Sequence, residues 1–176
     1  VSNELVSIYL DKGYSKSMYD QNAVKIYTDG SAKPNPGKGG IGIVAEFPDD
    51  MDCPNFELSF GYVLSTNNRM ELKAVIEALK WLQNELGVKQ ITRAIIITDS
   101  EYVFSCHKNV HYWKLNDWKA DNGKPYENSD MWSEFLKEKQ KVRTSVEIRW
   151  EKGKTREILK RVDFLAKQGS DNPTEI

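Results

Sequence analysis

Residues 94–100 have the sequence AIIITDS, an aliphatic run that ends abruptly at an acidic residue. A short run of β-branched residues bounded by turn-forming residues is typical of a buried strand. Residues 24–31, VKIYTDGS, follow the same plan, with alternating β-branched residues before Asp29 and a turn-rich stretch after it. If the two strands are neighbours in one sheet, the carboxylates of Asp29 and Asp99 meet at the same edge.

The elements around these two strands predict the fold class. Two further strands are expected at 41–47 and 56–64, and together with 24–28 they form an antiparallel meander. A helical period follows from 66 to 86, with Gly87 as the stop. We expect the remaining elements to be a short helix at 102–107, an irregular segment at 108–128, helices at 130–142 and 158–168, and a strand at 146–150. This order predicts an α/β fold with a mixed five-stranded sheet, three strands antiparallel and two parallel, flanked by helices on both faces.

Composition places the chain among globular proteins. Its 176 residues are 39% hydrophobic and 29% charged, about the size of one domain on the usual prior of roughly 100–200 residues. The longest aliphatic run, 94–97, is far shorter than the roughly 20 residues that cross a bilayer. Two cysteines and two histidines are too few for a disulfide scaffold or a thiolate zinc site. We expect a cytoplasmic monomer with an N-terminal extension at 1–22, a domain at 23–169 and a tail at 170–176.

The chain as a whole is nearly neutral, but one segment is strongly basic. The net charge is −1, whereas residues 137–161 carry ten Lys and Arg against four acids, a local excess of +6. Such a region can contact a phosphate backbone. A solvated helix face explains the same charges, and sequence alone leaves both interpretations open.

Two more acids accompany Asp29 and Asp99. Glu71 lies in the first turn of the long helix, and Asp163 lies in the last helix between two apolar residues. Carboxylates gathered without cations raise each other's pKa, and hard divalent ions such as Mg²⁺ and Mn²⁺ relieve the repulsion. Each acid also has a plain structural explanation, as a turn residue, a helix cap, a favourable charge at a helix N-terminus or an exposed helix acid.

The local sequences around these acids resemble the successive signatures of one enzyme family. They are TDGS at 28–31 with Asn35-Pro36-Gly37, TNNRMEL at 66–72, and TDSEYV at 98–103. The segment from Trp113 to Trp132 is similar to a basic protrusion and the helix after it, and 150–153 and 162–166 resemble a last strand and last helix. In order and spacing these motifs resemble type 1 ribonuclease H (ribonuclease HI), over roughly residues 23–169.

The resemblance implies a ribonuclease H-like fold and an endonuclease that hydrolyses the RNA strand of an RNA/DNA hybrid, leaving 5′-phosphate and 3′-hydroxyl ends. It makes Asp29, Glu71, Asp99 and Asp163 the catalytic, metal-binding carboxylates. Two Mg²⁺ ions per site are expected, with Mn²⁺ as a possible substitute. Such a pair of ions activates water and stabilises the leaving oxygen, so no nucleophilic side chain is needed.

The resemblance also implies a set of substrate contacts. Asparagine amides and backbone groups are expected in the minor groove of the hybrid, where the 2′-hydroxyls lie, while tryptophans and lysines follow the DNA strand. The expected contacts are Gly30, Ser31, Asn35, Thr66, Asn67, Asn68, Arg69, Glu101, Trp113, Lys114, Trp118, Lys119, Lys124 and Lys154. The tryptophans of 105–128 are equally well explained as core packing.

The loop after the last strand departs from the family pattern. Many members carry a histidine directly after the Lys-Gly of this loop, whereas here the position is Lys154. A lysine of ordinary pKa is a poor general base at neutral pH, so Lys154 is better suited to attract a phosphate. Activity is still expected because all four carboxylates are present, although the rate or the metal preference is expected to differ.

Three alternatives remain. Gly37 to Gly42 matches a dinucleotide-binding G-x-G-x-x-G pattern, but a strand is expected there where that motif must open a helix. A hybrid-binding relative with impaired catalysis fits the missing loop histidine. Another metal-dependent nuclease of the same fold, resolvase-like or integrase-like, fits the acids but not TNNRMEL.

Overall fold

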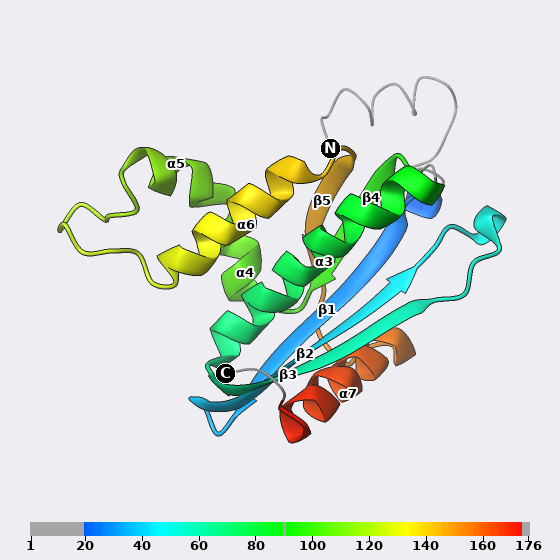
Figure 1. The fold of residues 1–176 in the computed structure, drawn as a ribbon, viewed down its shortest axis with the longest axis horizontal. Coiled ribbons are helices and arrows are strands. Elements are labelled where there is room, and N and C mark those ends of the chain that lie inside the picture. The colour runs from blue at the N-terminus through cyan, green and yellow to red at the C-terminus, as the bar shows by residue number, and fades with distance from the viewer. Residues whose placement is uncertain (1–19, 90, 174–176) are drawn as a thin grey trace.

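The computed structural model describes residues 20–89 and 91–173. One five-stranded sheet, in the order β3-β2-β1-β4-β5, carries α3 and α6 over one face and α7 on the other (Figure 1). The strands are β1 Val24–Lys33, β2 Gly37–Glu46, β3 Phe56–Ser65, β4 Arg93–Thr98 and β5 Ser145–Trp150. The helices are α3 Asn67–Lys89, α4 Glu101–Cys106, α5 Val110–Leu115, α6 Ser129–Lys141 and α7 Glu157–Asp171, with 3₁₀ turns η1 Asp49–Met51 and η2 His107–Asn109.

The sheet confirms the predicted fold class. Strands β1, β2 and β3 form an antiparallel meander, and β4 and β5 lie parallel to β1. The parallel ladder between β1 and β4 ends where Thr28 pairs with Thr98. Asp29 and Asp99 each follow one of these paired threonines, so the topology brings the two acids to the same place.

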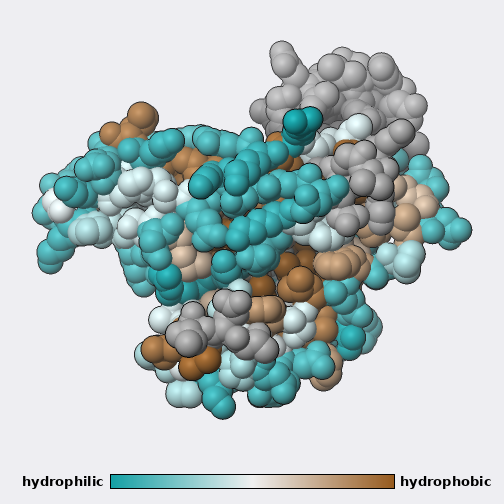
Figure 2. Space-filling view, in the orientation of Figure 1, coloured by the Kyte–Doolittle hydropathy of each residue, from teal (hydrophilic) through white to brown (hydrophobic). Residues whose placement is uncertain are grey.

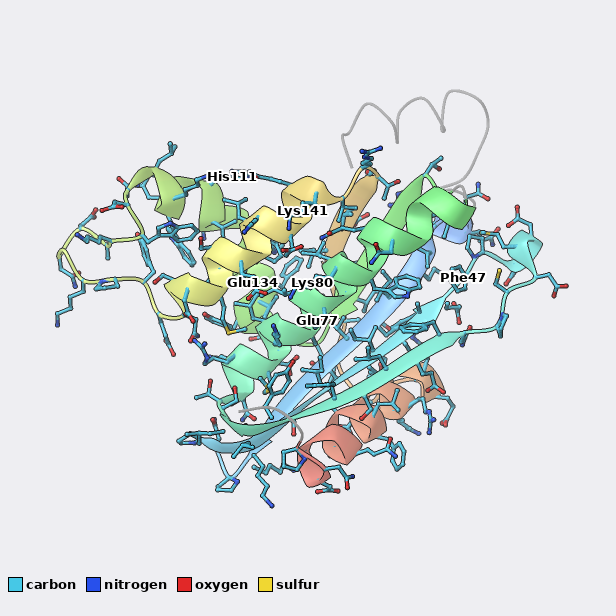
Figure 3. All side chains as sticks on the ribbon, in the orientation of Figure 1. Phe47, Glu77, Lys80, His111, Glu134 and Lys141 are labelled. Atoms are coloured by element: carbon cyan, nitrogen blue, oxygen red, sulfur yellow. The ribbon has the colours of Figure 1, made fainter. Side chains whose placement is uncertain are left out.

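Alternation along the strands separates two apolar layers. Val24 and Ile26 of β1 pack in the larger core with α3 and α6, while Tyr27 faces α7. Helix α6 is held on α3 by fully buried Trp132 and by ion pairs at the exposed edge. There Lys80 Nζ lies 3.0 Å from Glu134 Oε1, and Figure 3 shows both beside Glu77 where the two helices face each other. This packing ties the segment after α4 to the helix that carries Glu71.

Strand β1 is longer than the sequence predicts. We expected it to stop at Asp29, but it continues to Lys33, because pairing with β2 persists until Lys33 faces Lys38. Asp29 therefore lies inside a strand and is fixed by the ladder to β2. Helix α3 likewise continues past the expected stop at Gly87, to Lys89.

The segment 108–128 is not wholly irregular, which corrects a second prediction. It contains part of η2 and all of α5, and α5 buries only Val110. One buried residue in six leaves no helical period to detect. Helix α6 starts after Asn128, whose φ is +57°, and not after the expected caps Ser129 or Asp130.

Several remaining predictions concern the ends of the chain and its charge. The expected extension at 1–22 falls mostly outside the described residues, as does the end of the expected tail. Within the described part of the chain, no helix combines the length and apolarity needed to cross a membrane. Gly37 to Gly42 lie in β2, so the dinucleotide-binding alternative is wrong. The basic stretch 137–161 is spread over three elements, and ion pairs with acids engage Lys141, Arg149, Lys154, Arg156, Lys160 and Arg161.

Candidate metal centre and nucleic-acid interface

Three of the four predicted acids form a compact cluster. Asp29 comes from β1, Glu71 from the first turns of α3, and Asp99 from the residue that follows β4. One carboxylate oxygen from each lies within 4.8 Å of the others. Oxygen ligands at this spacing suit a hard divalent cation such as Mg²⁺ or Mn²⁺.

The approach of α3 to β1 depends on the residue after Asp29. A Cβ at Gly30 would collide with the backbone of Met70 and Glu71. Only a residue without a side chain lets the N-terminal turns of the helix lie against the strand, which places Glu71 beside Asp29. The glycine of the TDGS signature is thus explained by packing between backbones.

The protonation of the cluster follows from its burial. Asp29 is 7% exposed, and burial together with the charges of Asp99 and Asp163 raises its pKa to about 7, although the Gly30 N–H donates to its Oδ1 at 2.9 Å. Burial, followed by the charge of Asp29, raises the pKa of Glu71 well above its usual value. Burial also raises the pKa of Asp99. The raised pKa values mean that, without a metal ion, the cluster binds protons more readily than isolated carboxylates do.

Two oxygens of the cluster have no hydrogen-bond donor. Glu71 Oε2 and Asp99 Oδ1 are buried, and neither has a partner among the described residues. Buried polar atoms are normally satisfied, and an ion is one of the accepted reasons for an exception. The donor set and its unsatisfied oxygens therefore fit a divalent metal held by Asp29, Glu71 and Asp99.

The fourth acid lies beside this cluster in a different environment. Asp163 of α7 lines a small cavity together with Asp29 and Asp99. Its Oδ2 accepts a hydrogen bond from Lys167 Nζ at 2.8 Å, and its Oδ1 lies 3.7 Å from Lys154 Nζ. The interpretation of these acids as carboxylates gathered without cations is wrong for Asp163, and the charge of Lys154 also acts on Asp99. The i, i+4 spacing of Asp163 and Lys167 was the signal that the sequence analysis missed.

The loop that carries Lys154 packs directly on Asp99. A Cβ at Gly153 would collide with the Asp99 carboxylate, and Lys154 has a left-handed φ of +63°. The indole of Trp150 donates to the backbone carbonyl of Asp99 at 2.9 Å. Sequence reasoning assigned no such role to this tryptophan, because the contact joins residues 51 positions apart.

The predicted groove residues hold the β1–β2 turn against α3. Asn67 Oδ1 accepts from the Ala32 N–H at 2.7 Å, and the Asn67 N–H donates to Asn35 Oδ1 at 3.1 Å. Thr66 Oγ1 caps α3 by accepting the Arg69 N–H at 3.3 Å. Near them, Ser31 Oγ is buried and has no hydrogen-bond partner among the described residues, Asn68 is half-buried and Glu101 is exposed at the start of α4.

Arg69 connects the TNNRMEL segment to α6. Its guanidinium forms a bidentate pair with Asp130 at 2.8 and 3.1 Å and also donates to Asn128 Oδ1 at 3.1 Å. Asn128 in turn donates to the hydroxyl of Tyr102, which also accepts from the indole of Trp132 at 3.0 Å. The arginine is therefore committed to a protein network between three helices.

The predicted DNA-strand residues divide into two kinds. The Trp113 ring stacks on Tyr126 at 4.5 Å, and Trp113 and Trp118 both pack against the larger core, which favours the packing interpretation of these tryptophans. Lys114, Lys119 and Lys124 are exposed. Figure 2 shows a hydrophobic patch at the α5 end of this surface, where Leu115 is 85% exposed.

Comparisons with known proteins agree with this geometry. A family model described as RNase H matches residues 21–171. Ribonuclease HI of Pasteurella multocida (strain Pm70) is 40% identical over 156 residues, which cover 88% of this chain and 94% of that protein. Ribonuclease H of Actinobacillus pleuropneumoniae serotype 5b (strain L20) is 42% identical over 153 residues, or 86% and 92% of the two chains.

Solved structures show the same similarity. LC9-RNase H1, described as a type 1 RNase H with the type 2 active-site motif, has a TM-score of 0.69 at 28% identity and covers 86% of this chain and 74% of its own. A foamy viral protease-reverse transcriptase in complex with RNA/DNA hybrid also has a TM-score of 0.69, at 27% identity, over 84% of this chain and 20% of the viral one. The predicted resemblance is confirmed, and the chain belongs to the ribonuclease H family of hydrolases.

Proposed function

We propose that the chain hydrolyses the RNA strand of RNA/DNA hybrids with two divalent metal ions and leaves 5′-phosphate and 3′-hydroxyl ends. The observation that carries this proposal is the buried cluster of Asp29, Glu71 and Asp99, in which two carboxylate oxygens have no partner. The cluster lies in a chain that is 40% identical to Ribonuclease HI of Pasteurella multocida over 88% of its length.

The carboxylates supply position and charge for the reaction. Asp29, Glu71 and Asp99 would hold one metal ion, and Asp163 of α7 would hold a second together with Asp29. When bound, Mg²⁺ or Mn²⁺ activates a water and neutralises charge on the scissile phosphate. The β1–β4 ladder and the close approach of α3 keep the ligand oxygens in place before any ion arrives. This preorganisation avoids reorganisation during the reaction.

The substrate side is proposed from the residues around the cluster. Gly30, Ser31 and the amides at 35, 67 and 68 face the minor groove in this proposal, with Glu101 at its edge and Thr66 beside a DNA phosphate. The buried Ser31 hydroxyl, which has no partner among the described residues, supports this assignment. The exposed lysines at 114, 119 and 124 follow the DNA strand, and Lys154 remains a candidate phosphate contact. Trp113, Trp118 and Arg69 act through the packing that positions these groups.

The cellular setting and the domain limits complete the proposal. We assign the catalytic unit to residues 23–169, and α7 continues two residues beyond this limit, to Asp171. In this proposal the chain acts as a monomer in the cytoplasm and removes RNA from hybrids. A monomer suffices because one chain supplies all four carboxylates. Residues 1–22 have no assigned role.

The test is cleavage of a labelled RNA/DNA hybrid beside duplex RNA, duplex DNA and single-stranded RNA, with Mg²⁺, with Mn²⁺ and with EDTA. Metal-dependent cutting confined to the hybrid, and lost in Asp29→Asn, is the expected result. End-labelled products report whether the 5′ end carries the phosphate. Cutting of duplex DNA instead would favour another nuclease of the same fold.

A hybrid-binding relative with impaired catalysis is the second candidate. The observation that favours it is Lys154 at the loop position where many family members carry a histidine, with its amine against Asp163. Asp99→Asn separates the two candidates. An enzyme loses cleavage and retains binding to the hybrid, whereas a binding protein has no cleavage to lose.

A further inference from the structure

The two lysines around Asp163 distinguish it from the other acids of the centre. Both of its carboxylate oxygens have an ammonium neighbour, Lys167 at 2.8 Å on Oδ2 and Lys154 at 3.7 Å on Oδ1. The cluster of Asp29, Glu71 and Asp99 instead retains two buried oxygens without a partner. Asp163 is thus paired with two of the protein's own cations, whereas Asp99 of the cluster is influenced by Lys154 only through the charge of the ammonium group.

The position of Lys154 is built into the loop. Gly153 lies so close to the Asp99 carboxylate that no side chain fits there, and Lys154 itself has a left-handed backbone that non-glycine residues seldom adopt. Such a conformation is unfavourable for an ordinary residue and persists only where the surroundings impose it. The backbone therefore fixes where the Lys154 side chain starts, beside Asp99, and its amine lies 3.7 Å from Asp163 Oδ1.

We infer that Lys154 sets the metal requirement of this enzyme by competing, together with Lys167, for the Asp163 carboxylate. The first divalent ion binds at Asp29, Glu71 and Asp99, and an ion that uses Asp163 binds more weakly because it must displace or tolerate two ammonium groups. This inference rests on the proposed two-metal function and concerns only the relative affinity of the two ions.

The size of the effect follows from exposure. The Lys154 side chain is 61% exposed, so solvent and salt screen its charge. We expect removal of the charge to tighten the second ion by roughly three- to tenfold and the first ion by less, because Lys154 pairs with Asp163 and acts on Asp99 only through its charge. Raising the salt concentration should reduce the difference in second-ion affinity between the parent chain and the variant without the Lys154 charge, because the effect of Lys154 is electrostatic.

The experiment titrates Mn²⁺ into the metal-free full chain and counts bound ions by electron paramagnetic resonance, with isothermal titration calorimetry of Mg²⁺ as a second measurement. Lys154→Asn is the test variant, since asparagine is neutral and tolerates a left-handed backbone. Lys154→Arg keeps the charge. Lys160→Gln removes one charge from the same helix as Asp163, where Lys160 pairs with Glu157 at 3.0 Å.

The expected result is one tighter and one weaker ion in the parent chain, with the weaker ion tightened in Lys154→Asn alone. Equal tightening in Lys160→Gln, or none in Lys154→Asn, overturns the inference and leaves the proposed function intact. Asp29→Asn must lose the first ion. If the parent chain binds no divalent ion, the proposed metal mechanism fails together with this inference.

Discussion

The two ends of the β1–β4 pair hold acids in opposite states. Beside the start of these strands, Asp20, which precedes β1, and Glu147 of β5 are both bound by Arg93, the first residue of β4, and by Arg149 of β5, at 2.7 to 3.3 Å. At the other end, Glu71 Oε2 and Asp99 Oδ1 of the metal cluster have no hydrogen-bond partner within residues 20–89 and 91–173. One compensated group of acids and one uncompensated group therefore lie beside opposite ends of the β1–β4 pair.

The pKa values follow the same division. Burial raises the pKa of Asp20, but Arg149 and Arg93 outweigh it and hold that pKa below its usual value. Burial and neighbouring acids raise the pKa of Asp29 to about 7. The paired end adds stability near neutral pH, and the metal end lowers it until a cation binds. The candidate functional site differs from the structural ion-pair group because its buried acids lack the arginines that neutralise Asp20 and Glu147.

Exchanging one acid at each end gives the largest contrast in activity. We expect Glu71→Gln to lower hybrid cleavage by at least about a hundredfold, because a ligand is lost from the metal cluster. Glu147→Gln should retain the parent rate at a temperature where it is folded. Single-turnover cleavage with matched hybrid binding measures both. Equal loss in the two variants would remove the functional distinction between the ends.

Breaking the paired end should cost stability instead of activity. Arg93 is 6% exposed, and Arg93→Met leaves Asp20 and Glu147 with one guanidinium between them. We expect a loss of roughly 3 kcal/mol in the free energy of unfolding by urea, with unchanged cleavage per folded molecule. Arg161→Met, which breaks an exposed pair with Glu57, is the control and should change little. A similar loss in both variants would show that the burial of Arg93 is not what matters.

The sequence predicts the metal end better than the paired end. Asp29, Glu71 and Asp99 stand inside recognisable motifs, and the parallel pairing of β1 with β4 brings Asp29 and Asp99 together. Arg149 and Asp20 are 129 positions apart, and Arg69 and Asp130 are 61 apart, with no local pattern to couple them. Such ion pairs depend on side-chain geometry that the order of elements does not determine.

The errors within the fold have similar causes. Asp29 was expected to end its strand because Gly30 and Ser31 are turn-forming residues, yet the ladder to β2 overrides that local preference. Helix α5 escaped detection because a six-residue helix with one buried residue has no period. Lys154 was identified as a departure from the family, but its pairing with Asp163 required the structure.

Removing a carboxylate from the metal end should stabilise the metal-free protein. The pKa of Asp29 is about 7 in the folded chain and near its ordinary value in the unfolded chain. Its ionisation therefore lowers the free energy of unfolding, increasingly so as pH rises from about 4 to 7. Asp29→Asn should therefore raise the free energy of unfolding by about 2 kcal/mol at pH 8 in EDTA and hardly change it at pH 4. Urea unfolding at both pH values measures it. A variant that is less stable than its parent at pH 8 would contradict the idea of an uncompensated cluster.

The matching change at the paired end should show the opposite pH dependence and a smaller size. Because the pKa of Asp20 is lowered on folding, its contribution is present above its unfolded pKa of about 4 and disappears as pH falls through the folded value. Asp20→Asn should lower the free energy of unfolding by about 1 kcal/mol at pH 7, a modest loss because the side chain is partly exposed. At the lowest pH at which the chain still folds, the substitution should have no measurable effect. Parent and variant are compared by urea unfolding across pH 3 to 8. If the differences for Asp20→Asn and Asp29→Asn changed with pH in the same direction, net charge would explain both, and the contrast between the two strand ends would be lost.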